Sequence, residues 1–222
     1  MRRATVSADI IRSTSLDAHA TRLMHEHLHQ FLARMEERFD NCWGRIIRGD
    51  GIECVLGDER LALRVALMLK CHIKAFNAKT DRYVYAAFGP RYFFNRFGVR
   101  IAIGFGDLRT NDKDIGIIDG PAIYNSGRLL DSMSRRMRTN IVVAGDDCRL
   151  MRIVQTIATL CDTILTHATS KQCEVLFMRM QGMSELEIAD RLKITQVATN
   201  GHLRRAGWYA LEQAMQAFEE LI

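Results

Sequence analysis

The sequence predicts an α+β fold in which a β-sheet unit is followed by an all-helical C-terminal region. Three observations predict it. The first half of the chain alternates short β-branched runs with amphipathic helical patterns, a glycine-rich hairpin signal separates two of those runs, and only helical patterns occur beyond residue 145. The chain has 222 residues, of which 48% are hydrophobic, so it has enough apolar side chains for a packed core.

The first predicted elements are a strand, a long helix and a hairpin. Residues 4–11 form a β-branched run, and residues 15–39 then place apolar side chains at helical spacing. Two short apolar runs follow, on either side of Gly49, Asp50 and Gly51. Because glycine readily adopts positive φ, these three residues predict a hairpin with Asp50 at its tip.

The next elements complete a sheet. Residues 59–77 have a helical pattern, residues 99–108 are a nearly continuous apolar strand, a helix begins near Pro121, and residues 140–145 form one more strand. The order β-α-β-β-α-β-α-β predicts a sheet with helices packed on one face, which is an α/β sandwich of ferredoxin-like plan.

The predicted boundaries divide the chain into three parts. Residues 1–145 form the sheet unit, residues 146–169 a connecting helix, and residues 170–222 a small helical domain. The net charge of +5 is a weak indication of an anionic partner. From residue 166 onward 6 Lys and Arg oppose 7 Asp and Glu, so the positive excess lies in the N-terminal part.

Cysteine spacing and hydropathy argue against several classes of protein. The six cysteines show no C-x-x-C pair, which disfavours a zinc ribbon or a disulfide framework. No run of eighteen apolar residues and no secretory signal is found, so we expect no membrane span and a cytoplasmic location.

The C-terminal region has the pattern of a helix-turn-helix. One helix ends at Gly182, Ser184 with Glu187 three residues later predicts the capped start of a second helix, and Thr195 caps a third. The side chains expected between the two later helices are Ile188, Ala189, Leu192, Ile194, Val197 and Leu203.

This segment of about 35 residues resembles the helix-turn-helix of the LuxR and sigma-factor type. The resemblance implies DNA binding, because polar and cationic side chains on the last helix can reach phosphates and base edges. An alternative is a packing or dimerisation arm, which the near-neutral charge and the helix-weakening Gly201 favour. The predicted DNA-binding residues are Thr195, Gln196, Thr199, Asn200, His202, Arg204 and Arg205.

Two carboxylates in the N-terminal unit predict a metal site. If the first strand is central and the hairpin lies beside it, Asp9 at the strand end and Asp50 at the hairpin tip are neighbours. Mg²⁺ and Mn²⁺ prefer such oxygen ligands, together with phosphate oxygens and water. The alternative is that both residues only close turns on an inert fold.

Four segments resemble, in the same order, motifs of class III nucleotidyl cyclases: DIIRSTSL, RGDGIECVL, VRIAIGFGDL and DGPAIYNSGRLLD. The combination of DGPAIY with a following helix-turn-helix resembles the SatD family. The resemblance implies that Asp9 and Asp50 hold metal ions, and that Arg128 stabilises the transition state across a head-to-tail homodimer. It also implies that the Ile10 carbonyl assists in binding the metal, and that backbone N–H groups of the turn formed by Ile11, Arg12, Ser13 and Thr14 bind a triphosphate.

The chain also departs from the cyclase pattern. Arg12 stands where the family has a turn glycine, and Tyr124 stands at the position of the ribose-orienting asparagine, with Asn125 one place later. The base-selecting aspartate aligns with Ile117, and Asp119 is displaced by two positions. These departures favour a degenerate nucleotide or metal site over cyclase turnover.

Three further segments carry weaker patterns. His25 to His29 fit H-E-x-x-H, but no third ligand follows, so a solvated helix face is the preferred interpretation. Residues 82–100 interleave aromatic side chains with arginines, which is more often a loop or short helix with buried aromatics than a nucleic-acid surface. Residues 134–139 form a basic cluster, which usually indicates a solvated face.

Together the patterns predict a DNA-binding transcriptional regulator. Its cyclase-like domain forms a homodimer and binds a nucleoside triphosphate with Mg²⁺ or Mn²⁺ without efficient turnover. The alternatives are an active nucleotidyl cyclase that makes a cyclic nucleotide from ATP or GTP, and a non-catalytic dimerisation module.

Overall fold

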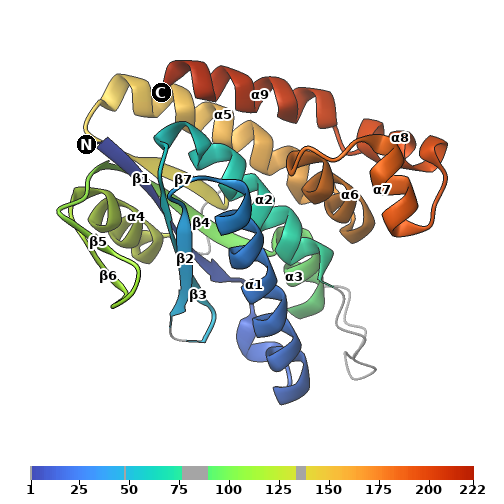
Figure 1. Ribbon diagram of the computed structural model, residues 1–222, viewed down its shortest axis with the longest axis horizontal. Helices are drawn as coiled ribbons and strands as arrows, with labels where there is room; N and C mark the ends of the chain where they lie inside the picture. Colours follow the sequence, from blue (N-terminus) through green and yellow to red (C-terminus); the bar gives the residue numbers. More distant parts are fainter. Residues whose placement is uncertain (1, 48, 77–89, 134–138) are drawn as a thin grey trace.

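The computed structural model describes residues 2–47, 49–76, 90–133 and 139–222. Within these residues a five-stranded sheet lies between helices, and further helices extend from one end of it (Figure 1). No helix in the described part of the chain is long and apolar enough to cross a membrane.

The central strand of the sheet is β1 (Arg2–Ile10). It pairs antiparallel with β3 (Gly51–Leu56) on one side and with β4 (Val99–Asp107) on the other. Outside these lie β2 (Trp43–Ile47), antiparallel to β3, and β7 (Ile141–Ala144), parallel to β4. The order β2-β3-β1-β4 is that of the predicted ferredoxin-like plan, and β7 adds a fifth strand.

One face of the sheet is covered by α1 (Ala18–Arg38) and α2 (Ala62–Ala75). Helix α1 forms because its apolar residues recur every three or four positions, and that stripe is buried together with Val6 and Ala8 of β1. The buried residues of α1 are Ala20, Met24, Leu28, Phe31, Leu32 and Met35.

The prediction that all helices pack on one face is wrong, because α4 (Pro121–Ser132) covers the opposite face (Figure 1). The hydroxyl of Ser126 lies 2.9 Å from that of Thr5 and 2.8 Å from that of Ser7, which point away from α1. A Cβ at Gly104 would lie 2.2 Å from the carbonyl oxygen of Ala122. Hydroxyl partners and a glycine therefore let α4 approach the sheet closely.

Short elements complete the N-terminal part. They are the 3-10 helices η1 (Ser13–Ser15) and η2 (Glu59–Leu61), helix α3 (Pro90–Phe97), and a small hairpin of β5 (Thr110–Asp112) and β6 (Ile117–Asp119).

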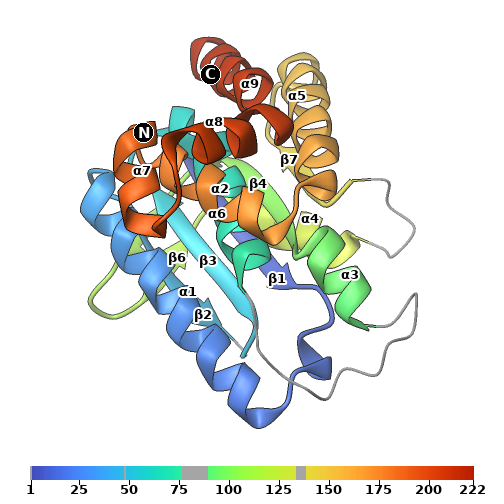
Figure 2. The same cartoon turned by 90° about the vertical axis from the view of Figure 1, so that its right-hand side faces the viewer.

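Five helices follow the sheet: α5 (Cys148–His167), α6 (Ser170–Met180), α7 (Glu185–Leu192), α8 (Gln196–Arg205) and α9 (Trp208–Leu221). Helix α6 packs on α2, and α9 runs beside α5 (Figure 2). One hydrophobic cluster continues from the sheet into these helices and includes Leu67, Leu176 and Phe218. The division at residues 145 and 169 stays a prediction.

Two buried lysines of α2 reinforce this junction. Lys70 Nζ lies 2.5 Å from Asp162 Oδ1 on α5, and Asp162 also accepts hydrogen bonds from Thr139 Oγ1 and the Asn140 backbone. Lys74 Nζ donates to backbone carbonyls near the end of α5. Each buried charge thus has hydrogen-bonding partners, as burial requires.

Candidate nucleotide pocket and candidate nucleic-acid interface

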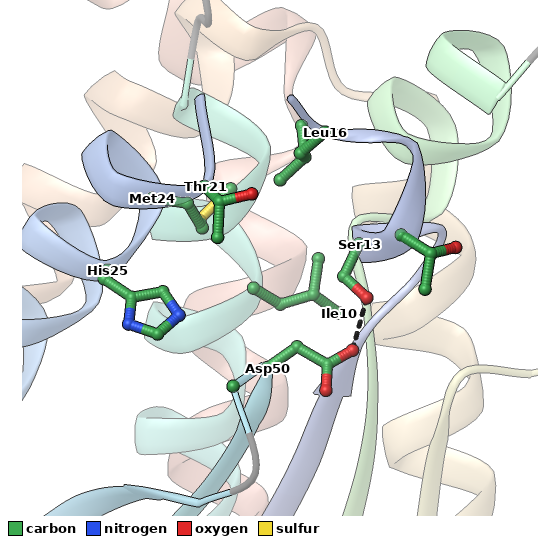
Figure 3. A pocket seen from close by; sticks show the side chains of 9 residues that line it. Ile10, Ser13, Leu16, Thr21, Met24, His25 and Asp50 are labelled. Carbon is green, nitrogen blue, oxygen red and sulfur yellow. Dashed lines mark hydrogen bonds between the residues drawn. The ribbon is translucent and has the colours of Figure 1, made fainter. Parts of the chain in front are cut away.

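A cavity of about 290 Å³ lies where the end of β1, the start of α1 and the β2–β3 hairpin meet (Figure 3). The hairpin places Asp50 at its tip, as predicted, and Gly49 there has a φ of 84°. The residues that line the cavity are Ile10, Ser13, Thr14, Leu16, Thr21, Met24, His25, Gly49 and Asp50.

Asp9 at the end of β1 is paired with Arg100 of β4. The two residues face each other across the antiparallel ladder, and both carboxylate oxygens accept hydrogen bonds from the guanidinium. Arg100 also donates to the carbonyl oxygen of Met133 at 2.8 Å. The hydrogen bond with Asp9 raises the pKa of Arg100, and the charge of Asp50 adds a smaller contribution. Asp9 is therefore the direct partner of Arg100, whereas Asp50 acts on it only through its charge.

Asp50 has its own partner on the neighbouring turn. Its Oδ2 accepts a hydrogen bond from the hydroxyl of Ser13 (Figure 3). No cluster of three or more His, Cys, Asp or Glu residues that could hold a metal occurs among the described residues. Because Arg100 occupies both oxygens of Asp9, the residues in this arrangement do not fit a divalent ion.

The turn after β1 differs from a free phosphate cradle. The Ile11 N–H donates to the carbonyl oxygen of Gly98 at 3.0 Å, because β1 continues to pair with the chain before β4. The prediction that this N–H is available to a triphosphate is therefore wrong. Arg12 adopts the left-handed conformation, with φ 62° and ψ 29°, which explains why a glycine suits this position. Ile10, Ser13 and Thr14 do line the cavity.

The α4 residues that the cyclase resemblance singles out have local contacts. The exposed Arg128 lies over the Tyr124 ring at 5.6 Å and does not line the cavity. The Tyr124 hydroxyl donates to Asp119, which also accepts from Arg109. Asn125 Nδ2 donates to the carbonyl oxygen of Phe105 at 2.8 Å and thereby ties α4 to β4. Where the resemblance assigns base and ribose recognition, Asp119 and Tyr124 thus form an exposed network with Arg109, and Asn125 ties α4 to β4.

The H-E-x-x-H segment does not form a metal site among the described residues. His25 is half-buried and lines the cavity, whereas His29 is exposed and lines a neighbouring groove of about 630 Å³. The intervening His27 stacks on His72 of α2 at 3.6 Å, and each ring nitrogen Nε2 donates to the other residue's carbonyl oxygen at 2.7 Å. The His27–His72 pair has no sequence signal, because its members lie on different helices.

Burial lowers the pKa of both imidazoles of this pair. The pKa of His72 falls to about 3, and Phe177 of α6 packs at 4.6 Å from its ring. Arg34 adds a smaller unfavourable charge to each imidazole. The residues at 82–89 and 134–138, which belong to the aromatic and basic patterns, lie outside the described residues.

The C-terminal capping pattern is present in the structure. Ser184 and Glu187 form a capping box at the start of α7, and Lys193 ends α7 in the left-handed conformation with φ 52°. Thr195 then caps α8 by accepting from the Ala198 N–H at 3.1 Å. Two helices of eight and ten residues are thus joined by a tight, capped turn.

Two predicted orientations on α8 are wrong. Val197 was expected between the helices but is 82% exposed, whereas Thr199 was expected to face DNA but is fully buried. Thr199 Oγ1 donates to the carbonyl oxygen of Thr195 at 3.3 Å. The buried side of α8 is instead formed by Thr199, Leu203 and Ala206, which recur at intervals of four and three residues.

The other predicted DNA-binding side chains are accessible to different extents. Thr195, Gln196, Asn200, Arg204 and Arg205 are exposed, and His202 is half-buried. Asn200 Nδ2 donates to Glu185 Oε1 of α7 at 3.2 Å, so this contact orients its amide.

The comparisons with known proteins give little support for a family. No protein-family model matches the chain, and no curated protein matches it. Among solved structures, a bacterial light-regulated adenylyl cyclase matches with a TM-score of 0.44 and 12% identity, over 65% of this chain and 43% of that chain. The chain therefore spans less than half the length of that protein. The SatD and helix-turn-helix assignments stay predictions, and the proposals below rest on the chain's own residues.

Proposed function

We propose that this chain is a DNA-binding transcriptional regulator in which α7 and α8 form a helix-turn-helix and α8 enters the major groove. One observation carries the proposal: α8 has a buried side and an exposed polar side. Within the described part of the chain, the guanidinium groups of the exposed Arg204 and Arg205 form no ion pair or hydrogen bond. Both guanidinium groups are therefore available to phosphates or to guanine.

The start of α8 adds further groups to its exposed polar side. Lys193 is exposed in the turn, and the first N–H groups of a helix carry a partial positive charge. An exposed cation beside a helix N-terminus favours a DNA phosphate at that position. Exposed Gln196 and Asn200 follow, and their amides have the donor and acceptor pair that adenine requires.

We further propose a homodimer, because two recognition helices read a two-fold DNA site. Ile153 and Leu160 lie seven residues apart on α5 and are 45% and 61% exposed, which gives that helix an apolar outer stripe. Burial of this stripe between two copies would remove apolar surface from water.

The test of DNA binding is the salt dependence of affinity for a pool of random-sequence duplexes, measured by fluorescence anisotropy with the full chain. Neutralised phosphates release counterions, so the slope of log K against log salt reports the number of contacts. In the Arg204→Ala/Arg205→Ala variant we expect weaker binding and a slope reduced by about two.

The matched control is the Arg22→Ala/Arg60→Ala variant, which removes the same charge from exposed positions outside α8 and outside the α5 stripe. It should bind as the unmodified chain does. An equal loss in both variants, or no binding at low salt, would contradict the proposal.

A second candidate function is nucleotide binding in the cavity at the end of β1. The specific observation is a cavity of about 290 Å³ with hydroxyls, an imidazole and Asp50 around an apolar floor. A size near the lower end of ligand pockets suits one nucleoside moiety. The experiment is a thermal shift with ATP or GTP, with and without Mn²⁺, beside Asp50→Asn, because a ligand that binds only the folded state raises the melting temperature. No rise with any combination would remove this candidate.

A further inference from the structure

The outward side of α8 has an apolar residue and a glycine at its centre. Val197, Gly201, Arg204 and Arg205 are spaced at i, i+4, i+7 and i+8, so they share one side of the helix. That side is opposite the buried Thr199 and Leu203. Val197 is 82% exposed, more than any other large hydrophobic side chain in the described part of the chain.

Nothing within the chain accounts for a glycine at position 201. Gly201 lies inside α8 and is not among the glycines with positive φ. A Cβ built there would meet only the flexible Arg205 side chain, at 3.4 Å, which is an ordinary contact. Glycine weakens a helix relative to alanine, but it lets a partner from outside the chain approach the helix backbone more closely than any side chain would.

The surroundings identify the chemistry of that partner. Cationic Lys193 and Arg204 lie at the two ends of α8, and the Asn200 amide lies beside Val197 and Gly201. In the major groove the C5-methyl group of thymine is the apolar group that a base edge presents, and the paired adenine matches an asparagine amide. Of its two Nδ2 hydrogens, Asn200 uses one for Glu185, which leaves the other hydrogen and Oδ1 for adenine.

We propose that Val197 contacts a thymine methyl group and that Gly201 allows α8 to lie close enough to the base edges for this contact. The proposal rests on the DNA binding proposed above and assigns its sequence preference to an A·T base pair under the first two turns of α8. Val197 is then a specificity-determining residue, whereas Arg204 contributes affinity for the backbone.

The first experiment selects preferred duplexes from the random pool with the full chain and then replaces each thymine in turn by deoxyuridine, which lacks only the methyl group. At one position in each half-site we expect the affinity to fall about fourfold, which is the effect of losing the burial of one methyl group. In Val197→Ala the same replacement should have no effect. Equal affinity for thymine and deoxyuridine at every position would overturn the role of Val197 while DNA binding stands, and failure to bind any duplex would overturn both proposals.

The second experiment uses Gly201→Ala with Gly127→Ala as its control. Gly127 lies inside α4, and a Cβ there meets nothing within 4 Å. Both substitutions should raise the melting temperature, because alanine favours the helix. Only Gly201→Ala should also lower the affinity for the selected duplex. If Gly201→Ala is more stable and binds DNA as tightly as the unmodified chain, the close approach at position 201 is wrong.

Discussion

The pocket at the end of β1 and the outer side of α8 differ in what their charged groups already bind. Asp50, which lines the pocket, is held by Ser13, and Asp9, which does not line it, is held by Arg100. On α8, Arg204 and Arg205 are exposed and make no ion pair within the described residues. A ligand at the pocket must compete with internal hydrogen-bonding partners. A ligand at α8 needs to displace only the water that hydrates Arg204 and Arg205. The second region is therefore the better prepared for an anion.

The His27–His72 pair links α1 and α2 to the C-terminal helices, because it packs against Phe177 of α6. The pH dependence of stability tests how much this contact contributes to the fold. The folded-state pKa of His72 is about 3, below the unfolded value near 6.5. Above pH 6.5 neither state takes up a proton, so the stability is complete there. As the pH falls further, the unfolded state is protonated first, and stability is lost until about pH 3.

Between pH 7 and pH 5 we expect the free energy of unfolding in urea to fall by about 2 kcal/mol through His72. In His72→Phe the flat ring stays in the stack but cannot be protonated, so this part of the loss should disappear. The control His29→Gln removes an exposed imidazole from α1, the helix that carries His27, and should retain the pH-dependent loss of stability. An unchanged pH dependence in His72→Phe would show that protonation of His72 does not cause the loss of stability.

The Arg100→Met variant tests whether the guanidinium keeps metal ions away from Asp9 at the end of β1. Arg100→Met leaves both oxygens of Asp9 without their partner, so Mn²⁺ affinity should rise at least about tenfold, which corresponds to about 1.4 kcal/mol. The measurement is Mn²⁺ binding by electron paramagnetic resonance. Arg109→Met removes the same charge from another aspartate pair, that with Asp119, and should leave Mn²⁺ binding unchanged. If the unmodified chain binds Mn²⁺ as tightly as Arg100→Met does, the guanidinium does not compete.

The sequence predicts the elements of both regions better than it predicts side-chain partners. The strands, the hairpin at Asp50 and the capped start of α7 follow from local patterns, and each is present. The Asp9–Arg100 pair depends on the register of two strands whose pairing residues are 91 positions apart in the chain, which no local pattern encodes. Similarly, α4 covers the second face because Thr5 and Ser7 find a hydroxyl there, although hydroxyls in a strand usually indicate solvent.

On α8 the error concerns two residues of the first turn, Val197 and Thr199, whereas Leu203 is buried as predicted. The two residues lie about 200° apart on the helix, so the prediction assigns the more apolar valine to the core side that the threonine occupies. Helix α8 has ten residues and few apolar side chains, so its sequence contains only a weak periodic signal for which side is buried. The contacts of α6, α7 and α9 with α8 set the phase, and these contacts are tertiary.

The last prediction compares a strained residue from each region. Arg12 in the pocket turn and Lys193 in the turn before α8 both adopt the left-handed conformation, with φ 62° and 52°. Glycine relieves this conformation, so Arg12→Gly and Lys193→Gly should each raise the free energy of unfolding by up to about 1 kcal/mol, reduced by the greater freedom of glycine in the unfolded chain. Asn41, with φ 55°, is the control, because asparagine tolerates this conformation and Asn41→Gly should change little.

The two glycine variants should differ in the salt dependence of their DNA affinity, although each removes one positive charge and one left-handed residue. Lys193 lies beside the N-terminus of α8, so Lys193→Gly should reduce the salt slope by about one. Arg12 lies at the end of β1, so Arg12→Gly should leave the salt slope unchanged. An equal reduction in both variants would mean that the two regions share one anionic partner, and the assignment of DNA to α8 alone would then be wrong.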